Sequence, residues 1–102
     1  MPLLDLSVEA QAANFELTDG PILSNMDRGR AIATWRGRMV NEHVSARVFA
    51  ALIPQMMKAG LSASWQERVA LMIQDELRHG RQCAAVVHAL GGEPIATLPP
   101  LA

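Results

Sequence analysis

The sequence predicts an all-α fold built on an antiparallel helical hairpin, and three observations lead to this prediction. Two long segments carry apolar residues at steps of three and four, which is the spacing of a helix that packs along one face. Gly60 lies between the two segments, where the chain can reverse. Helix-favouring residues are plentiful, whereas tyrosine is absent and aromatic residues make up only 4% of the chain, which disfavours sheets.

Length and composition limit the classes of protein that the chain can belong to. A chain of 102 residues has room for one domain and buries proportionately less surface than a larger protein, so we expect partner chains. The formal net charge of -1 argues against nucleic-acid binding, and no apolar run approaches the roughly 20 residues that cross a membrane. The N-terminal residues lack the basic flank of a secretory signal, so we expect a cytoplasmic protein. The single cysteine leaves oxygen and nitrogen as the ligands for any metal.

The first 24 residues are expected to form an extended N-terminal arm. They show no sustained period, and Pro2 together with the run from Thr18 to Pro21 is typical of loops. The arm nevertheless contains several leucines and a phenylalanine, which is too apolar for a freely solvated segment. We therefore expect residues 1–24 to lie on a helical surface, either of the same chain or of a partner.

The first long helix is predicted to begin at Ser24 or Asn25, where a polar side chain can cap it, and to run to about Ala59. Pro54 removes one hydrogen bond of the helical ladder, so an alternative is that the helix ends near Leu52. The stripe that faces its neighbours consists of Ile32, Trp35, Met39, Glu42, Ala46, Phe49 and Ile53.

The second long helix is predicted to begin at Ser64, because Glu67 three residues later would complete a capping box. Glycines and a proline within residues 91–94 end it. The two-helix unit therefore spans residues 25–94, and residues 95–102 are expected to form an extended tail. The stripe of the second helix consists of Val69, Met72, Glu76, His79, Cys83, Val86 and Leu90.

Three titratable residues of these stripes are predicted to meet at one depth in the hairpin. Glu42 lies 18 positions before Gly60, whereas Glu76 and His79 lie 16 and 19 positions after it. At 1.5 Å per residue, all three stand roughly 25 to 28 Å from the turn. Unpaired carboxylates on an apolar stripe are costly, so we expect a bound cation to compensate them.

A pair of metal ions would compensate these side chains well. A glutamate at position i and a histidine at i+3 project from one face of a helix, and carboxylates can bridge two cations. Oxygen and imidazole ligands suit iron or manganese and can accept zinc. One chain offers two carboxylates and one imidazole, whereas a di-iron site in a four-helix bundle uses four carboxylates and two histidines. We therefore expect a homo-oligomer, at least a dimer, in which two hairpins form a four-helix bundle around two iron ions.

At these residues the sequence resembles the ferritin-like superfamily of di-iron carboxylate proteins. The shared motif is a glutamate on one helix, here Glu42, and Glu-x-x-His on the next, here Glu76 to His79, and the close of the second helix at residues 89–94 is also similar. The resemblance covers about residues 25–95, which is half of the usual ferritin-like bundle. The chain is therefore similar to the two-helix encapsulated ferritins, or to a fragment of a longer ferritin-like oxidase.

The resemblance implies an oxidoreductase, either a ferroxidase or a protein that reacts with oxygen or peroxide. It implies that Glu42, Glu76 and His79 are both the metal ligands and the catalytic residues, with Glu76 bridging and His79 terminal. Two alternatives remain: a metal-free helical dimerisation or interaction module, and a fragment of a di-iron oxygenase that acts on an organic substrate.

Other polar residues near the motif have simpler interpretations. Asp75 lies four residues before His79 and could orient its ring from the second shell, although a solvated position explains it as well. His43 is expected to be a partly exposed packing residue and His88 a surface residue. Cys83 is expected to be a small buried hydrophobe.

Overall fold

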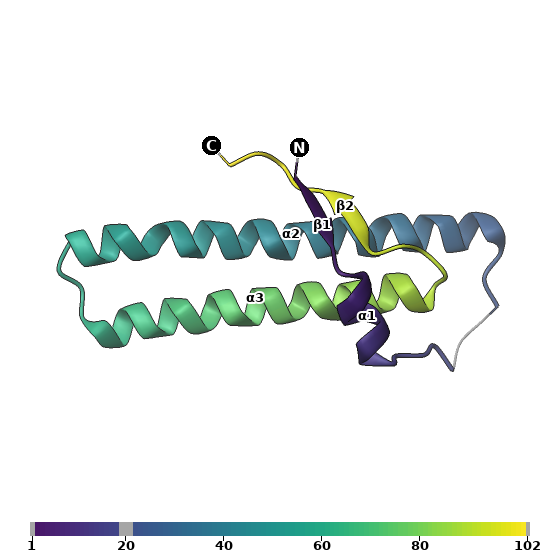
Figure 1. The fold of residues 1–102 in the computed structure, drawn as a ribbon, viewed down its shortest axis with the longest axis horizontal. Helices are drawn as coiled ribbons and strands as arrows, with labels where there is room; N and C mark the ends of the chain where they lie inside the picture. The colour runs from purple at the N-terminus through teal and green to yellow at the C-terminus, as the bar shows by residue number, and fades with distance from the viewer. Residues whose placement is uncertain (1, 19–21, 102) are drawn as a thin grey trace.

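The computed structural model describes residues 2–18 and 22–101 and consists mostly of helix. Two long antiparallel helices form the body, and the two ends of the chain cross one side of it (Figure 1). The predicted all-α hairpin is therefore confirmed, with a small sheet added. In chain order the elements are β1 (Leu3–Asp5), α1 (Ser7–Ala13), α2 (Asn25–Lys58), α3 (Ala63–Ala89) and β2 (Ile95–Thr97).

Helix α2 has the predicted bounds. The Ser24 hydroxyl accepts a hydrogen bond from the Asp27 amide at 3.1 Å and so caps the first turn. The helix continues to Lys58, and Gly60 turns the chain with a φ of 74°. The alternative end near Leu52 is wrong, because Pro54 lies inside the helix. Proline removes only one amide from the ladder, and the packing of α2 on α3 keeps the last turns helical.

Helix α3 begins slightly earlier than predicted. The cap is Ser62, whose hydroxyl accepts from the Trp65 amide at 3.4 Å, so the expected start at Ser64 with Glu67 as its capping partner is wrong. Ser62 has the extended backbone of a capping residue, which leaves Ser64 inside the first turn. The helix ends after Ala89, and Gly91 adopts a φ of 90°. The predicted glycine stop is confirmed.

The two ends of the chain are joined to each other and to the hairpin. Strands β1 and β2 pair antiparallel, with Leu3 opposite Thr97, so residues 95–97 of the tail are extended as expected. The expectation of a wholly extended arm is wrong, because Ser7–Ala13 is a helix. The Asp5 carboxylate accepts a hydrogen bond from the Ser7 amide at 2.9 Å just before the helix. Helix α1 packs on α3, which confirms that the arm lies on a helical surface. The predicted loop at 19–21 lies outside the described residues.

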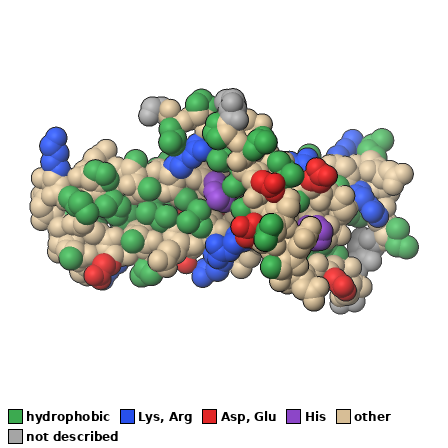
Figure 2. Space-filling view, viewed as in Figure 1, with side chains coloured by type: hydrophobic (Ala, Val, Ile, Leu, Met, Phe, Trp, Pro, Cys, Tyr) green, Lys and Arg blue, Asp and Glu red, His purple; other side chains and the backbone are tan. Residues whose placement is uncertain are grey.

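Burial divides the hairpin into two parts. Residues 47–75, on both sides of the turn, contain no buried residue, and we call them the loop half. The rest of α2 and α3 contains all the buried residues of the two long helices and is crossed by β1, α1 and β2, and we call it the covered half (Figure 1). Figure 2 shows apolar side chains gathered on the surface of the loop half. The buried apolar core consists of Leu4, Leu6, Ala10, Met39, Ala46, Cys83, Ala84, Ala85, Val87 and Leu90.

None of the helices formed by residues 2–18 and 22–101 is long and apolar enough to cross a membrane.

Candidate metal centre

The three predicted ligands meet near the middle of the hairpin. Glu42 on α2 and Glu76 and His79 on α3 each offer one ligand atom, and these atoms lie within 4.8 Å of one another. The Nδ1 atom of His79 is 3.6 Å from a carboxylate oxygen of Glu42. Reversal of the chain at Gly60 brings the two helices together at this height, so the predicted common depth of the three residues is confirmed.

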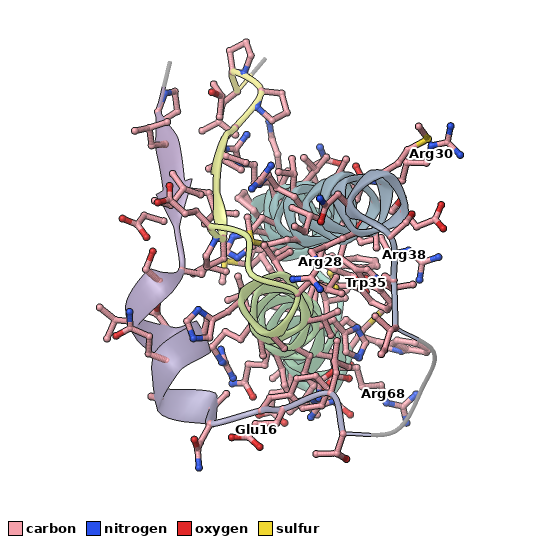
Figure 3. All side chains as sticks on the ribbon, turned by 90° about the vertical axis from the view of Figure 1, so that its right-hand side faces the viewer. Glu16, Arg28, Arg30, Trp35, Arg38 and Arg68 are labelled. Atoms are coloured by element: carbon pink, nitrogen blue, oxygen red, sulfur yellow. The ribbon has the colours of Figure 1, made fainter. Side chains whose placement is uncertain are left out.

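This cluster lies on the side of the hairpin that the chain ends do not cover. Seen along the helices, α1 and the strands occupy one side of the helix pair, whereas Trp35 and Arg38 point to the other (Figure 3). Glu42 follows Trp35 by seven residues, or two helical turns, and so shares its side of α2. We call this side the open face. The side chains of His79 and Glu42 are 43% and 28% exposed there.

The two carboxylates are placed so that they favour a cation between them. The pKa of Glu76 is raised, first by a hydrogen bond with Glu42, then by desolvation and by the negative charge of Glu42, while His79 opposes the shift. A positive ion placed between two neighbouring carboxylates would offset their mutual repulsion. The two carboxylates would supply oxygen ligands, and His79 would supply the nitrogen.

The ligands of one chain fit half of a two-metal site. Two carboxylates and one imidazole are too few to surround two ions, and the side chains of His79 and Glu42 are partly exposed to solvent. The mixture of oxygen and nitrogen donors suits iron or manganese and accepts zinc, while the only sulfur ligand, Cys83, is buried in the apolar core. Burial raises the pKa of the Cys83 thiol, and the charge of Glu42 raises it further.

The remaining residues named from the sequence lie around the cluster. The Asp75 carboxylate contacts the Arg78 guanidinium at 3.2 Å, and both side chains are more than half exposed. A role of Asp75 in orienting the ring of His79 stays a prediction. His88 is on the surface, as expected. Trp35 is partly buried, and the Arg38 guanidinium lies 4.7 Å from the centre of its ring. Trp35 also packs against the buried core cluster, which accounts for it as a packing residue.

One feature beside the ligands was not predicted from the sequence. Gly80, which follows His79, is buried, and the ring of His43 lies against it. The Nε2 atom of that ring is buried and has no hydrogen-bond partner among the described residues. Burial lowers the pKa of His43, and the charges of Arg47 and Arg81 lower it further. A glycine inside a helix often marks a close approach of another segment, and that signal could have identified the contact.

No family model, curated protein or solved structure matches this chain. The interpretation of the centre therefore depends on its geometry and chemistry.

Proposed function

We propose that the chain is a ferritin-like di-iron protein whose metal centre forms between two copies, and that it oxidises iron with oxygen or peroxide. The observation that carries this proposal is the convergence of Glu42, Glu76 and His79 on the open face, with their ligand atoms within 4.8 Å. A second set of the same ligands, related by a twofold axis, completes four carboxylates and two histidines.

The position of the ligands along the helices supports this arrangement. Glu42 stands at the middle of α2 (Asn25–Lys58), and Glu76 stands at the middle of α3 (Ala63–Ala89). A twofold axis through a centrally placed site makes two hairpins overlap along their whole length. With the axis perpendicular to the helices, the open face of the loop half of each copy lies against the open face of the covered half of the other, and apolar side chains on that face leave the solvent.

The apolar side chains of the loop half give this interface a driving force. Large hydrophobic residues stay substantially exposed in the single chain, and several of them lie near the turn. Exposed apolar side chains favour burial against a partner, and Met72 among them belongs to the α3 stripe that carries Glu76 and His79 on the open face. The members of this set are Val48, Leu52, Met57, Leu61, Trp65, Leu71 and Met72.

Each ligand has a distinct role in the proposed centre. Glu76 would hold the ions together with Glu42, because the ligand oxygens of the two carboxylates lie within 4.8 Å of each other. Glu42 binds as a terminal or bridging ligand, and His79 binds through nitrogen from the same face of α3 as Glu76. The bound iron would supply the electrons that reduce oxygen or peroxide. The protein positions the ions, and the second hairpin limits the access of water to them.

Iron binding and chain association test this proposal together. The protein, first treated with a chelator, is titrated anaerobically with ferrous iron, and its mass in solution is measured by light scattering. We expect a dimer that binds two ions and that gains ferric absorbance when air is admitted. Replacement of His79→Ala should weaken iron binding by more than about 100-fold, since loss of a supporting residue alone costs 10- to 100-fold.

His88→Ala is the matched control, because His88 is exposed on the same helix and away from the cluster. It should bind iron as the wild type does. A dimer that takes up no iron, manganese or zinc would contradict the proposal and support a metal-free interaction module. Full iron binding by His79→Ala would contradict the assignment of the ligands.

A further inference from the structure

The two long helices come into close contact beside the candidate centre, where the ring of His43 lies against Gly80. A Cβ atom built on Gly80 would lie 2.9 Å from Cδ2 of His43 and 3.1 Å from its Nε2. Separations this short are below ordinary van der Waals contact, so the histidine ring occupies the space that any other residue at position 80 would need. Only glycine allows the ring to lie on the backbone of α3 at this point.

This contact is adjacent to the ligands on both helices. His43 follows Glu42 in α2, and Gly80 follows His79 in α3. The same hypothetical Cβ of Gly80 would lie 3.7 Å from Cβ of Glu42, so the Glu42 backbone is also close to α3 at this height. A change in the separation of the helices here would move Glu42 relative to His79, which are 3.6 Å apart at their nearest polar atoms.

The ring of His43 is held by packing. Its Nε2 atom is buried and has no hydrogen-bond partner among residues 2–18 and 22–101, while its neighbours include the guanidinium groups of Arg47 and Arg81. With no hydrogen-bond partner at this atom, van der Waals contact with α3 holds the ring in place. The available contact is therefore steric, and the shape of the ring and the absence of a side chain at Gly80 determine how closely the helices approach.

We propose that His43 and Gly80 are positioning residues that set the helix separation at which Glu42 and His79 can bind the same pair of ions. This inference rests on the proposed metal-binding function. In this proposal, metal binding requires the ring of His43 on α2 and a residue without a side chain at position 80 on α3, in addition to the ligands. Neither residue contacts the ions in this proposal.

A double-mutant cycle tests the proposal. The variants are Gly80→Ala, His43→Ala and the pair combined, and each is measured for ferrous iron affinity and, without metal, for its midpoint of thermal unfolding. Gly80→Ala should weaken iron binding by about 10- to 100-fold, as expected for residues that orient ligands. The double variant should bind iron about 10-fold more tightly than Gly80→Ala, because removal of the ring makes room for the new methyl group.

Gly37→Ala is the matched control. Gly37 is also inside a long helix, but a Cβ atom built there meets nothing within 4 Å. This variant should leave iron affinity unchanged and raise the unfolding midpoint, since alanine favours a helix over glycine. The comparison separates helix propensity from the steric effect at Gly80.

Iron affinity and the midpoint of thermal unfolding distinguish failure of the positioning role from failure of the proposed metal-binding function. If Gly80→Ala binds iron like Gly37→Ala, or if His43→Ala does not relieve its defect, the positioning role is wrong while the metal site stands. If the wild type binds no metal, the proposed function is wrong and the positioning role is wrong with it. In that case additivity of the unfolding midpoints would show that the His43–Gly80 contact is also unimportant for the fold.

Discussion

The covered half and the loop half are parts of the same two helices, yet they differ in what surrounds them. In the covered half, β1, α1 and β2 form a second layer, and Met39 is fully buried. In the loop half no residue is buried, and Met57 remains 61% exposed. Apolar residues occur in both halves, so composition does not explain the contrast. A helical hairpin needs a further layer to form a core, and one chain supplies that layer for only half of its length.

Removal of side-chain volume should have very different costs in the two halves. Met39→Ala is expected to lower the free energy of unfolding by about 2–5 kcal/mol, because it leaves a cavity in the covered half. Met57→Ala should change it by no more than about 0.5 kcal/mol in dilute protein, because its side chain remains in water. Urea titration measures both values, and similar costs for the two variants would contradict the division into halves.

A charge on the open face of the loop half should disrupt the proposed dimer. Ile53 lies three turns after Glu42 on the same stripe and is partly buried, whereas Gln55 on the same helix is exposed. Ile53→Glu is expected to raise the dimer dissociation constant by at least about 100-fold, because a buried unpaired charge costs on the order of 3 kcal/mol.

Gln55→Glu introduces the same charge on the outer side of α2 and serves as its control. It should leave the dissociation constant within about threefold of the wild type, the range of surface substitutions. Analytical ultracentrifugation at several concentrations measures both variants. Equal effects of the two substitutions would show that the open face of the loop half is not the interface.

Glu76, at the border between the halves, should make the stability of the metal-free protein depend on pH, with a smaller effect than the substitutions above. Glu76 holds its proton more tightly in the folded protein than its ordinary pKa of 4.5 implies, because of its hydrogen bond with Glu42, its desolvation and the charge of Glu42. Its contribution to stability is therefore present below pH 4.5 and is lost as the pH rises through the raised pKa.

Glu76→Gln removes this titration. In the metal-free protein it should raise the unfolding midpoint at pH 7, and the gain should shrink as the pH falls toward 4.5. Glu67→Gln, at an exposed position of the same helix, is the control and should show no such trend. Thermal unfolding followed by circular dichroism at several pH values measures the difference. A gain that grows toward low pH would contradict the raised pKa of Glu76.

The long helices could be predicted from the sequence because their signals are local. The Ser24 cap, the stop at Gly91 and the turn at Gly60 are each defined by a few adjacent residues. Ser62 and Ser64 have the same capping chemistry, and the choice between them depends on the backbone of the turn, which the sequence does not specify. Helix α1 has seven residues, too few to show a period.

The candidate centre was predictable for a similar reason, and its surroundings were not. Glu76 and His79 are three residues apart and therefore lie on one face of α3. Helical rise and the chain reversal at Gly60 place them opposite Glu42. The pairing of β1 with β2 depends on residues at opposite ends of the chain, which have no local signal. The fit of His43 on Gly80 depends on the rotation of α2 against α3, which is determined by packing across the whole hairpin.

The pairing of Leu3 with Thr97 has a consequence for the order in which the molecule assembles. It closes a loop of almost the entire chain, and loops of that length are slow to close, whereas contacts near Gly60 need only a short segment. A newly made chain therefore forms its hairpin bend before its ends meet. During that interval both halves of the two helices are uncovered, so a nearby identical chain can associate before the arm and tail are in place.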